Sequence, residues 1–155
     1  MRHWTDILVE GTDQQSFTAY LEGAKRRLPK VRGAFKRIPM AYDPTLPHEA
    51  TQRAAGGRDT IQVGSKFMRL PDRQRDAILV HEIGHWVSTK VGLAGWLKEA
   101  NRMGIDPWDT ESLPWGQFNM EEAFAESFMV AVLEHDKRWP EWQKLALSVA
   151  ARAGL

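Results

Sequence analysis

The sequence contains no cysteine, and this absence excludes disulfide bonds, thiolate zinc ribbons and a cysteine nucleophile. No apolar run reaches the roughly 18 residues that a bilayer crossing needs, so we expect no membrane-spanning segment. The first six residues carry no apolar core, so we expect no classical secretion signal. The G-x-S-x-G, phosphate-loop and G-x-G-x-x-G patterns are also absent, which argues against serine hydrolase, nucleotide and dinucleotide chemistry.

Charge is nearly balanced overall but uneven along the chain. The formal net charge is +1, yet residues 1–80 hold 14 Lys and Arg against 9 Asp and Glu, whereas residues 81–155 hold 7 against 11. Seven of the basic residues lie between Lys25 and Arg37. This basic cluster could contact nucleic acid or an acidic partner, but a solvated helix end followed by a loop explains it more simply. We therefore expect no nucleic-acid partner.

The length of 155 residues, with 43% hydrophobic and 26% charged residues, predicts one soluble domain over residues 1–155. The pattern predicts an α+β fold with helices over 13–28, 71–91, 93–103, 120–135 and 141–152, strands over 37–42 and 60–67, and connections over 44–59 and 104–118. Thr12 and Gln15 resemble a capping box at the start of the first helix. Pro39 suggests that the first strand lies at a sheet edge.

Residues 81–85 read His-Glu-Ile-Gly-His, which is the H-E-x-x-H pattern. Residues four apart lie on one face of a helix, so His81 and His85 can present their imidazoles to one metal ion. Glu82 projects from the flank of that face, where its carboxylate can take a proton from a metal-bound water. The surrounding positions are apolar nearly all round, as in a helix buried in a core. A helix that merely carried two core histidines would need separate polar partners for both rings.

A catalytic zinc ion needs a third protein ligand and keeps its fourth position for water. The extended metzincin pattern would place glycine at position 88 and a ligand at position 91, where this chain has Ser88 and Val91, so the ligand must lie elsewhere. The segment 119–128 offers two carboxylates, Glu122 and Glu126, one helical turn apart.

The helical spacing places these two carboxylates on one face, which we expect to be directed at the core. The residues on that face are Glu122, Glu126, Met129 and Leu133, and those on a second face, which looks solvated, are Ala123, Ser127 and Glu134. Buried carboxylates are costly unless a cation compensates them, and a dication held by two histidines would do so. Asn119 followed by Glu122 also matches a capping box, in which case Glu126 is the stronger ligand candidate.

The pairing of H-E-x-x-H with Glu122-Ala-Phe-Ala-Glu126-x-Phe128 resembles the gluzincin metallopeptidases. It is most similar to the catalytic-domain family of anthrax lethal factor, which has relatives in toxins and phages, and to the single-domain minigluzincins. The resemblance covers about residues 60–135 and implies a zincin-like core, in which a small sheet packs on an active-site helix and a second ligand-bearing helix. It leaves residues 1–59 as an N-terminal helix and strand and residues 140–155 as a C-terminal helix. It further implies one zinc ion per chain bound by His81, His85 and Glu122, with Glu82 as general base and Glu126 behind the ligands.

One position departs from the family pattern. A tyrosine that assists at the oxyanion stands seven residues before the ligand glutamate in the family, and here that position is Trp115. An indole N–H can donate a hydrogen bond but is not a practical acid. Trp115 and His48 are therefore candidates for the oxyanion or the substrate cleft, and the oxyanion group stays unassigned.

The resemblance predicts a zinc-dependent metalloendopeptidase that acts on proteins or peptides, in a cytoplasmic or virion-associated location. The strand over 60–67 could pair with an extended substrate at a free edge. The alternative is a weak or inactive zincin-like module whose zinc is structural, within a phage or toxin assembly. The sequence does not define the oligomeric state.

Overall fold

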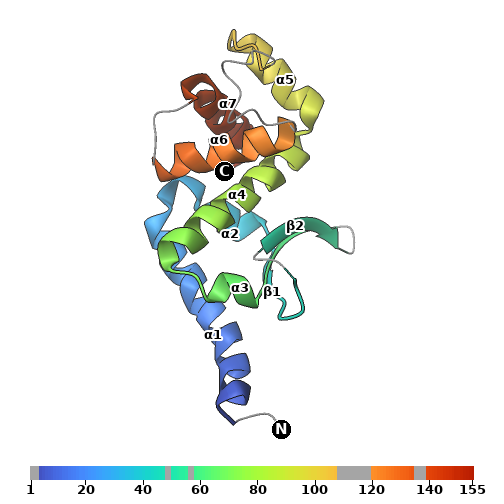
Figure 1. Ribbon diagram of the computed structural model, residues 1–155. Coiled ribbons are helices and arrows are strands. Elements are labelled where there is room, and N and C mark those ends of the chain that lie inside the picture. Colours follow the sequence, from blue (N-terminus) through green and yellow to red (C-terminus); the bar gives the residue numbers. More distant parts are fainter. Residues whose placement is uncertain (1–3, 48–49, 56–57, 108–119, 135–138) are drawn as a thin grey trace. The chain divides into compact units, whose positions relative to one another are not determined.

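A computed structural model describes residues 4–47, 50–55, 58–107, 120–134 and 139–155 of the chain (Figure 1). The chain divides into two compact units, residues 1–78 and 79–155, and the boundary falls inside helix α4 (Asp72–Val91). Helices predominate and a small sheet lies in the first unit, so the predicted α+β class is confirmed. Among the described residues, no helix combines the length and apolar character that crossing a bilayer requires.

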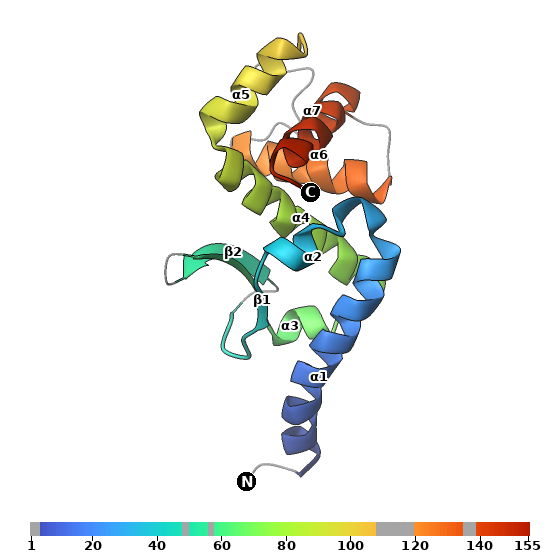
Figure 2. The ribbon, with the colours of Figure 1, turned by 180° about the vertical axis from the view of Figure 1, so that it is seen from behind.

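The first unit begins with a helix longer than the sequence predicted. Helix α1 (Trp4–Arg27) starts well before residue 13, so Thr12 lies inside it and the capping-box prediction is wrong. Pro29 ends the helix as predicted and opens the short 3-10 helix η1 (Pro29–Val31), which is followed by α2 (Ala34–Arg37). Both views show the short helix α3 (Ser65–Met68) beside α1 (Figures 1 and 2), and the two helices are in contact.

Aromatic packing and one buried carboxylate hold the first unit together. The rings of Phe17 and Tyr20 from α1 pack against the ring of Phe67 from α3, with centroids 6.4 Å and 5.3 Å from it. The Tyr20 hydroxyl donates to Asp76 Oδ1 at 2.8 Å, and Arg27 donates two hydrogen bonds to the same carboxylate. Burial, together with the bond to Asp76, raises the pKa of Tyr20. The Tyr20 hydroxyl therefore makes a structural contact within the first unit.

The sheet has three strands in the order β1-β3-β2. Strand β1 (Met40–Tyr42) pairs in parallel with β3 (Arg58–Val63), and β2 (Ala50–Ala55) pairs with β3 antiparallel along its whole length. β1 is an edge strand, as Pro39 predicted. β3 is the central strand, so the predicted free edge for a peptide on this strand is wrong.

Two further predictions about the first unit are wrong. The predicted connection over 44–59 contains β2, which forms because it pairs with β3 although its own residues favour strands only weakly. The predicted strand over 60–67 ends at Val63, because Gly64 leads directly into α3. The paired residues Ala55 and Arg58 end the ladder between β2 and β3.

The second unit is helical, and the ends of its helices agree with the sequence predictions to within about two residues. It comprises the rest of α4, then α5 (Leu93–Arg102), α6 (Met120–Leu133) and α7 (Pro140–Arg152). Gly92 ends α4 with a φ of 82°, a conformation that glycine adopts without strain. Pro140 occupies the first turn of α7, where a backbone N–H has no partner within the helix, so the absence of this group in proline costs no hydrogen bond.

The core of the second unit is built on large aromatic side chains. Trp96 of α5 is fully buried and packs against Phe124 of α6 and Trp142 of α7, with ring centroids 5.6 Å and 5.9 Å apart. Trp86 of α4 is also buried, as predicted. The ring contacts of Trp96 join α5, α6 and α7.

The predicted burial of the two faces of α6 is wrong. Ala123 and Ser127, expected to be solvated, are fully buried, and Glu122 and Glu126 are only half-buried. The Ser127 hydroxyl is satisfied inside the helix because it donates to the Ala123 carbonyl at 2.8 Å. Small side chains on this face let neighbouring helices, including α7, approach α6 closely.

A buried carboxylate links α5 to α7. Glu99 is 2% exposed, accepts hydrogen bonds from Arg102 and Ser148, and forms an ion pair with Arg152. The hydrogen bonds from Arg102 and Ser148, with the charges of Arg102 and Arg152, hold the pKa of Glu99 at about 2, below its ordinary value of 4.5. Because the folded-state pKa is depressed, this stabilisation is fully present above pH 4.5 and is lost as the pH falls toward 2.

We therefore expect Glu99→Gln to lower the melting temperature at pH 7, and the difference from the unmodified protein to shrink as the pH falls from 4.5 to 2. Glu141→Gln, at an exposed position in the first turn of α7, is the control for loss of one negative charge and should lower the melting temperature much less, by its interaction with the helix dipole alone. Thermal unfolding, monitored by circular dichroism in the presence of a chelator, measures the difference. A difference between Glu99→Gln and the unmodified protein that persists unchanged to pH 2 would contradict this assignment.

Candidate metal centre

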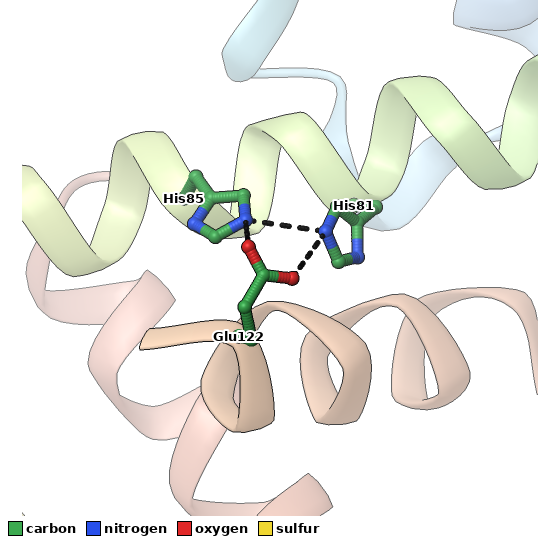
Figure 3. A group of neighbouring side chains, drawn as sticks. All are labelled: His81, His85 and Glu122. Atoms are coloured by element: carbon green, nitrogen blue, oxygen red, sulfur yellow. Dashed lines mark hydrogen bonds and ion pairs between the residues drawn. The ribbon is translucent and has the colours of Figure 1, made fainter. Parts of the chain in front are cut away.

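Helix α4 presents two imidazoles on one face, as the four-residue spacing predicted. His81 and His85 are each 18% exposed in their side chains, and their Nε2 atoms lie 3.1 Å apart (Figure 3). Their rings are nearly perpendicular, at 79°, with centroids 4.8 Å apart. Both Nε2 atoms are thus directed at one point beside the helix.

Helix α6 brings a carboxylate to the same point. Glu122 Oε1 lies 2.8 Å from His85 Nε2, and its Oε2 lies 3.2 Å from His81 Nε2 (Figure 3). These three residues form a group that could hold a metal ion. Donor atoms about 2.0–2.2 Å from a tetrahedral zinc ion are about 3.3–3.6 Å apart, so the three donors need to separate by only a few tenths of an ångström. The residues present therefore fit a zinc ion.

Glu126 lies on the other side of the first imidazole. Its Oε1 is 3.0 Å from His81 Nδ1, a buried nitrogen that has no well-aligned hydrogen bond among the described residues. Burial lowers the pKa of His81, but the neighbouring carboxylates of Glu126, Glu122 and Glu82 outweigh this effect and raise it. A carboxylate at Nδ1 favours the tautomer in which Nε2 is free to bind a metal. The two glutamates, which helical spacing alone could not separate, thus approach different nitrogens of His81.

The carboxylate of Glu82 is not part of this group. Glu82 is half-buried on α4, and within the described part of the chain it makes no hydrogen bond or ion pair, although its charge acts on His81. The side chain of Glu122 is 44% exposed, so the site is open to solvent on that side. Glu82 is therefore a carboxylate available for proton transfer next to an accessible donor set.

A close helix crossing holds α6 against α4 at this site. A Cβ atom on Gly84 would lie 2.9 Å from the backbone Cα of Ala125 and 3.2 Å from its carbonyl oxygen. Backbone atoms cannot rotate away, so the crossing requires glycine at position 84. Ala125 lies between the two glutamates of α6, so this contact sets how near they come to the histidines. The glycine inside H-E-x-x-H and the alanines of α6 were a visible sequence signal for this contact, which was not predicted.

We expect Gly84→Ala to weaken zinc binding by about 10–100-fold, the usual range for residues that only support ligands. Overpacking costs about 1–3 kcal/mol and the better helix propensity of alanine returns about 1, so the free energy of unfolding should fall by up to about 2 kcal/mol. Zinc titration and chemical denaturation measure the two effects.

The control is Gly95→Ala in α5, where the new Cβ meets only the Val91 side chain, which can rotate. It should leave zinc affinity unchanged. A Gly84→Ala protein that is more stable than the original and binds zinc equally well would show that the crossing does not position the ligands.

Several sequence predictions fall on residues outside those that the structure describes. These are the oxyanion candidates Trp115 and His48, the cap residue Asn119 and most of the connection over 104–118. They stay predictions. Of the basic cluster, Lys25 pairs with Glu22 at 3.0 Å and Arg27 binds Asp76, contacts that agree with a structured helix end.

Comparison of the chain with protein-family models, with curated proteins and with solved structures finds no match. The geometry of the site and the properties of its residues therefore carry the functional argument.

Proposed function

We propose that the protein is a zinc-dependent metalloendopeptidase of gluzincin type. The observation that carries this proposal is the convergence of His81 Nε2, His85 Nε2 and the Glu122 carboxylate, within bonding reach of one ion. Two histidines and one glutamate form a donor set used at catalytic zinc sites, which leave a fourth position open. The open side at Glu122 supports a catalytic rather than a closed structural site.

When bound, zinc acts as a Lewis acid toward the scissile carbonyl and lowers the pKa of its water to about 7. Glu82 accepts the proton that the attacking water loses and delivers it to the amine that leaves. Glu126 holds the His81 ring through Nδ1 and keeps Nε2 directed at the metal. Trp115 and His48 are the candidates for contacts to the oxyanion.

The test is digestion of a peptide library and of unfolded casein by the zinc-loaded protein, with products identified by mass spectrometry. We expect internal peptide bonds to be cleaved, 1,10-phenanthroline to abolish the cleavage, and added zinc to restore it. Cleavage that persists after complete metal removal would contradict the proposal.

The alternative function is a zincin-like module with a structural or degenerate zinc site, in which Trp115 replaces the family tyrosine. Stoichiometric zinc binding without cleavage of any library peptide would favour it over the peptidase. The donor geometry supports zinc binding in either case, so only the digestion separates the two functions.

A further inference from the structure

A concave site separate from the metal centre lies in the unit of residues 79–155, where the C-terminal ends of α4 and α7 meet the side of α5. It encloses about 780 Å³, a volume within the range of small-molecule sites. Four basic side chains line it, Lys90 from α4, Lys98 and Arg102 from α5, and Arg152 from α7, together with one acidic side chain, Glu99. We call it the basic cleft.

The basic cleft is positively charged although the half of the chain that contains it is acidic. Residues 79–155 contain 7 Lys and Arg but 11 Asp and Glu, so this half of the chain is acidic. Four of those seven basic residues nevertheless line one cavity, and Glu99 is the one carboxylate among the described residues that line it. Basic residues are common at helix C-termini, where they complement the helix dipole. That effect does not explain why cations from three helices line the same cavity.

Glu99 fixes two of the four cations in place. It is 2% exposed, accepts hydrogen bonds from Arg102 Nε and Nη2, and pairs with Arg152 Nε through its other oxygen. The side chains of Arg102 and Arg152 nevertheless remain 60% and 57% exposed. Two guanidinium groups are thus held by a buried carboxylate while most of their surface faces solvent, which reduces the entropy lost when they bind an anion.

The two lysines can add their positive charge to that of Arg102 and Arg152. Within the described part of the chain neither Lys90 nor Lys98 forms an ion pair, and the Lys90 ammonium lies 5.9 Å from the centre of the Trp86 ring. Both are exposed. Their charge is therefore not neutralised by a described carboxylate.

We propose that the basic cleft binds a small anion that carries linked phosphoryl groups, with pyrophosphate as its simplest form. Guanidinium groups match phosphate oxygens with paired N–H donors, and lysines add compact charges. Among the described residues that line the cleft, four cations and one carboxylate leave an excess of three positive charges, which suits a multiply charged anion better than a single carboxylate. This site is independent of the proposed metal centre and would stand if the peptidase proposal failed.

The test is calorimetric titration of pyrophosphate into the metal-free full chain at low salt, because pyrophosphate also chelates zinc. We expect one saturable site per chain. Lys98→Glu should weaken binding about 10-fold or more, since it removes one attraction and adds a repulsion, and Lys98→Gln should weaken it less. Lys144→Glu, an equal charge change at an exposed position on α7 that does not line the cleft, should leave affinity within about twofold.

Titration with orthophosphate asks whether linked phosphoryl groups are required, and we expect it to bind more weakly than pyrophosphate. Unchanged melting temperatures confirm that the variants fold. The proposal is overturned if pyrophosphate shows no saturable binding, if orthophosphate binds equally well, or if Lys98→Glu and Lys144→Glu weaken binding to the same extent.

Discussion

Replacing Glu82 by glutamine should lower peptide cleavage by about 10²–10⁴-fold while leaving zinc content and folding unchanged. Glutamine keeps the shape of the side chain but cannot accept the proton from water. Glu82 is not one of the three residues whose donor atoms converge, so its replacement should not release the metal. Single-turnover rates on a cleaved library peptide, with zinc content measured on the same samples, make the comparison.

Two outcomes would contradict this role. A Glu82→Gln protein that loses zinc would show that Glu82 is a ligand, and one that cleaves at the original rate would show that another group takes the proton. Glu121→Gln, at an exposed position on α6, is a control for removal of a nearby negative charge and should retain activity.

The second large effect concerns the choice between the two glutamates of α6. Glu122→Ala should weaken zinc binding by more than about 100-fold, because the side chain that reaches both Nε2 atoms is lost. Glu126→Ala should weaken it by about 10–100-fold, because only the support at His81 Nδ1 is lost. Zinc titration against a competing chelator measures both affinities.

Melting of the metal-free variants separates a ligand from a helix cap. If Glu122 served only to cap α6, its replacement by alanine would cost about 0.5–2 kcal/mol of stability and leave zinc affinity intact. Glu122→Gln removes the charge at constant size and should lose zinc with little change in apo-protein stability. Abolished zinc binding in Glu126→Ala but not in Glu122→Ala would reverse the assignment.

Some features set by local sequence were predicted correctly, although the capping-box signal at Thr12 was not among them. Gly92 and Pro140 mark helix ends through their own backbone preferences, and the four-residue spacing of His81 and His85 follows from the helical repeat. These signals depend on a few neighbouring residues, so they do not require knowledge of the tertiary structure.

Features set by partners distant in the sequence were not predicted. β2 forms because β3 pairs with it, and Ala123 is buried by neighbouring helices rather than by any property of its own. Glu122 and Glu126 share a face, so helical periodicity could not separate them. The family resemblance favoured Glu122, and in the structure this carboxylate lies beside both Nε2 atoms while Glu126 lies beside His81 Nδ1. The basic cleft combines residues from 90 to 152, a range over which sequence spacing predicts no contact.

Anomalous diffraction from zinc-loaded crystals, recorded on both sides of the zinc absorption edge, shows whether α4 and α6 form a metal centre. We expect one anomalous peak per chain, about 2.0–2.2 Å from the Nε2 atoms of His81 and His85 and from a Glu122 oxygen. The absence of a peak between these side chains, or a zinc ion ligated by Glu126 in place of Glu122, would contradict this expectation.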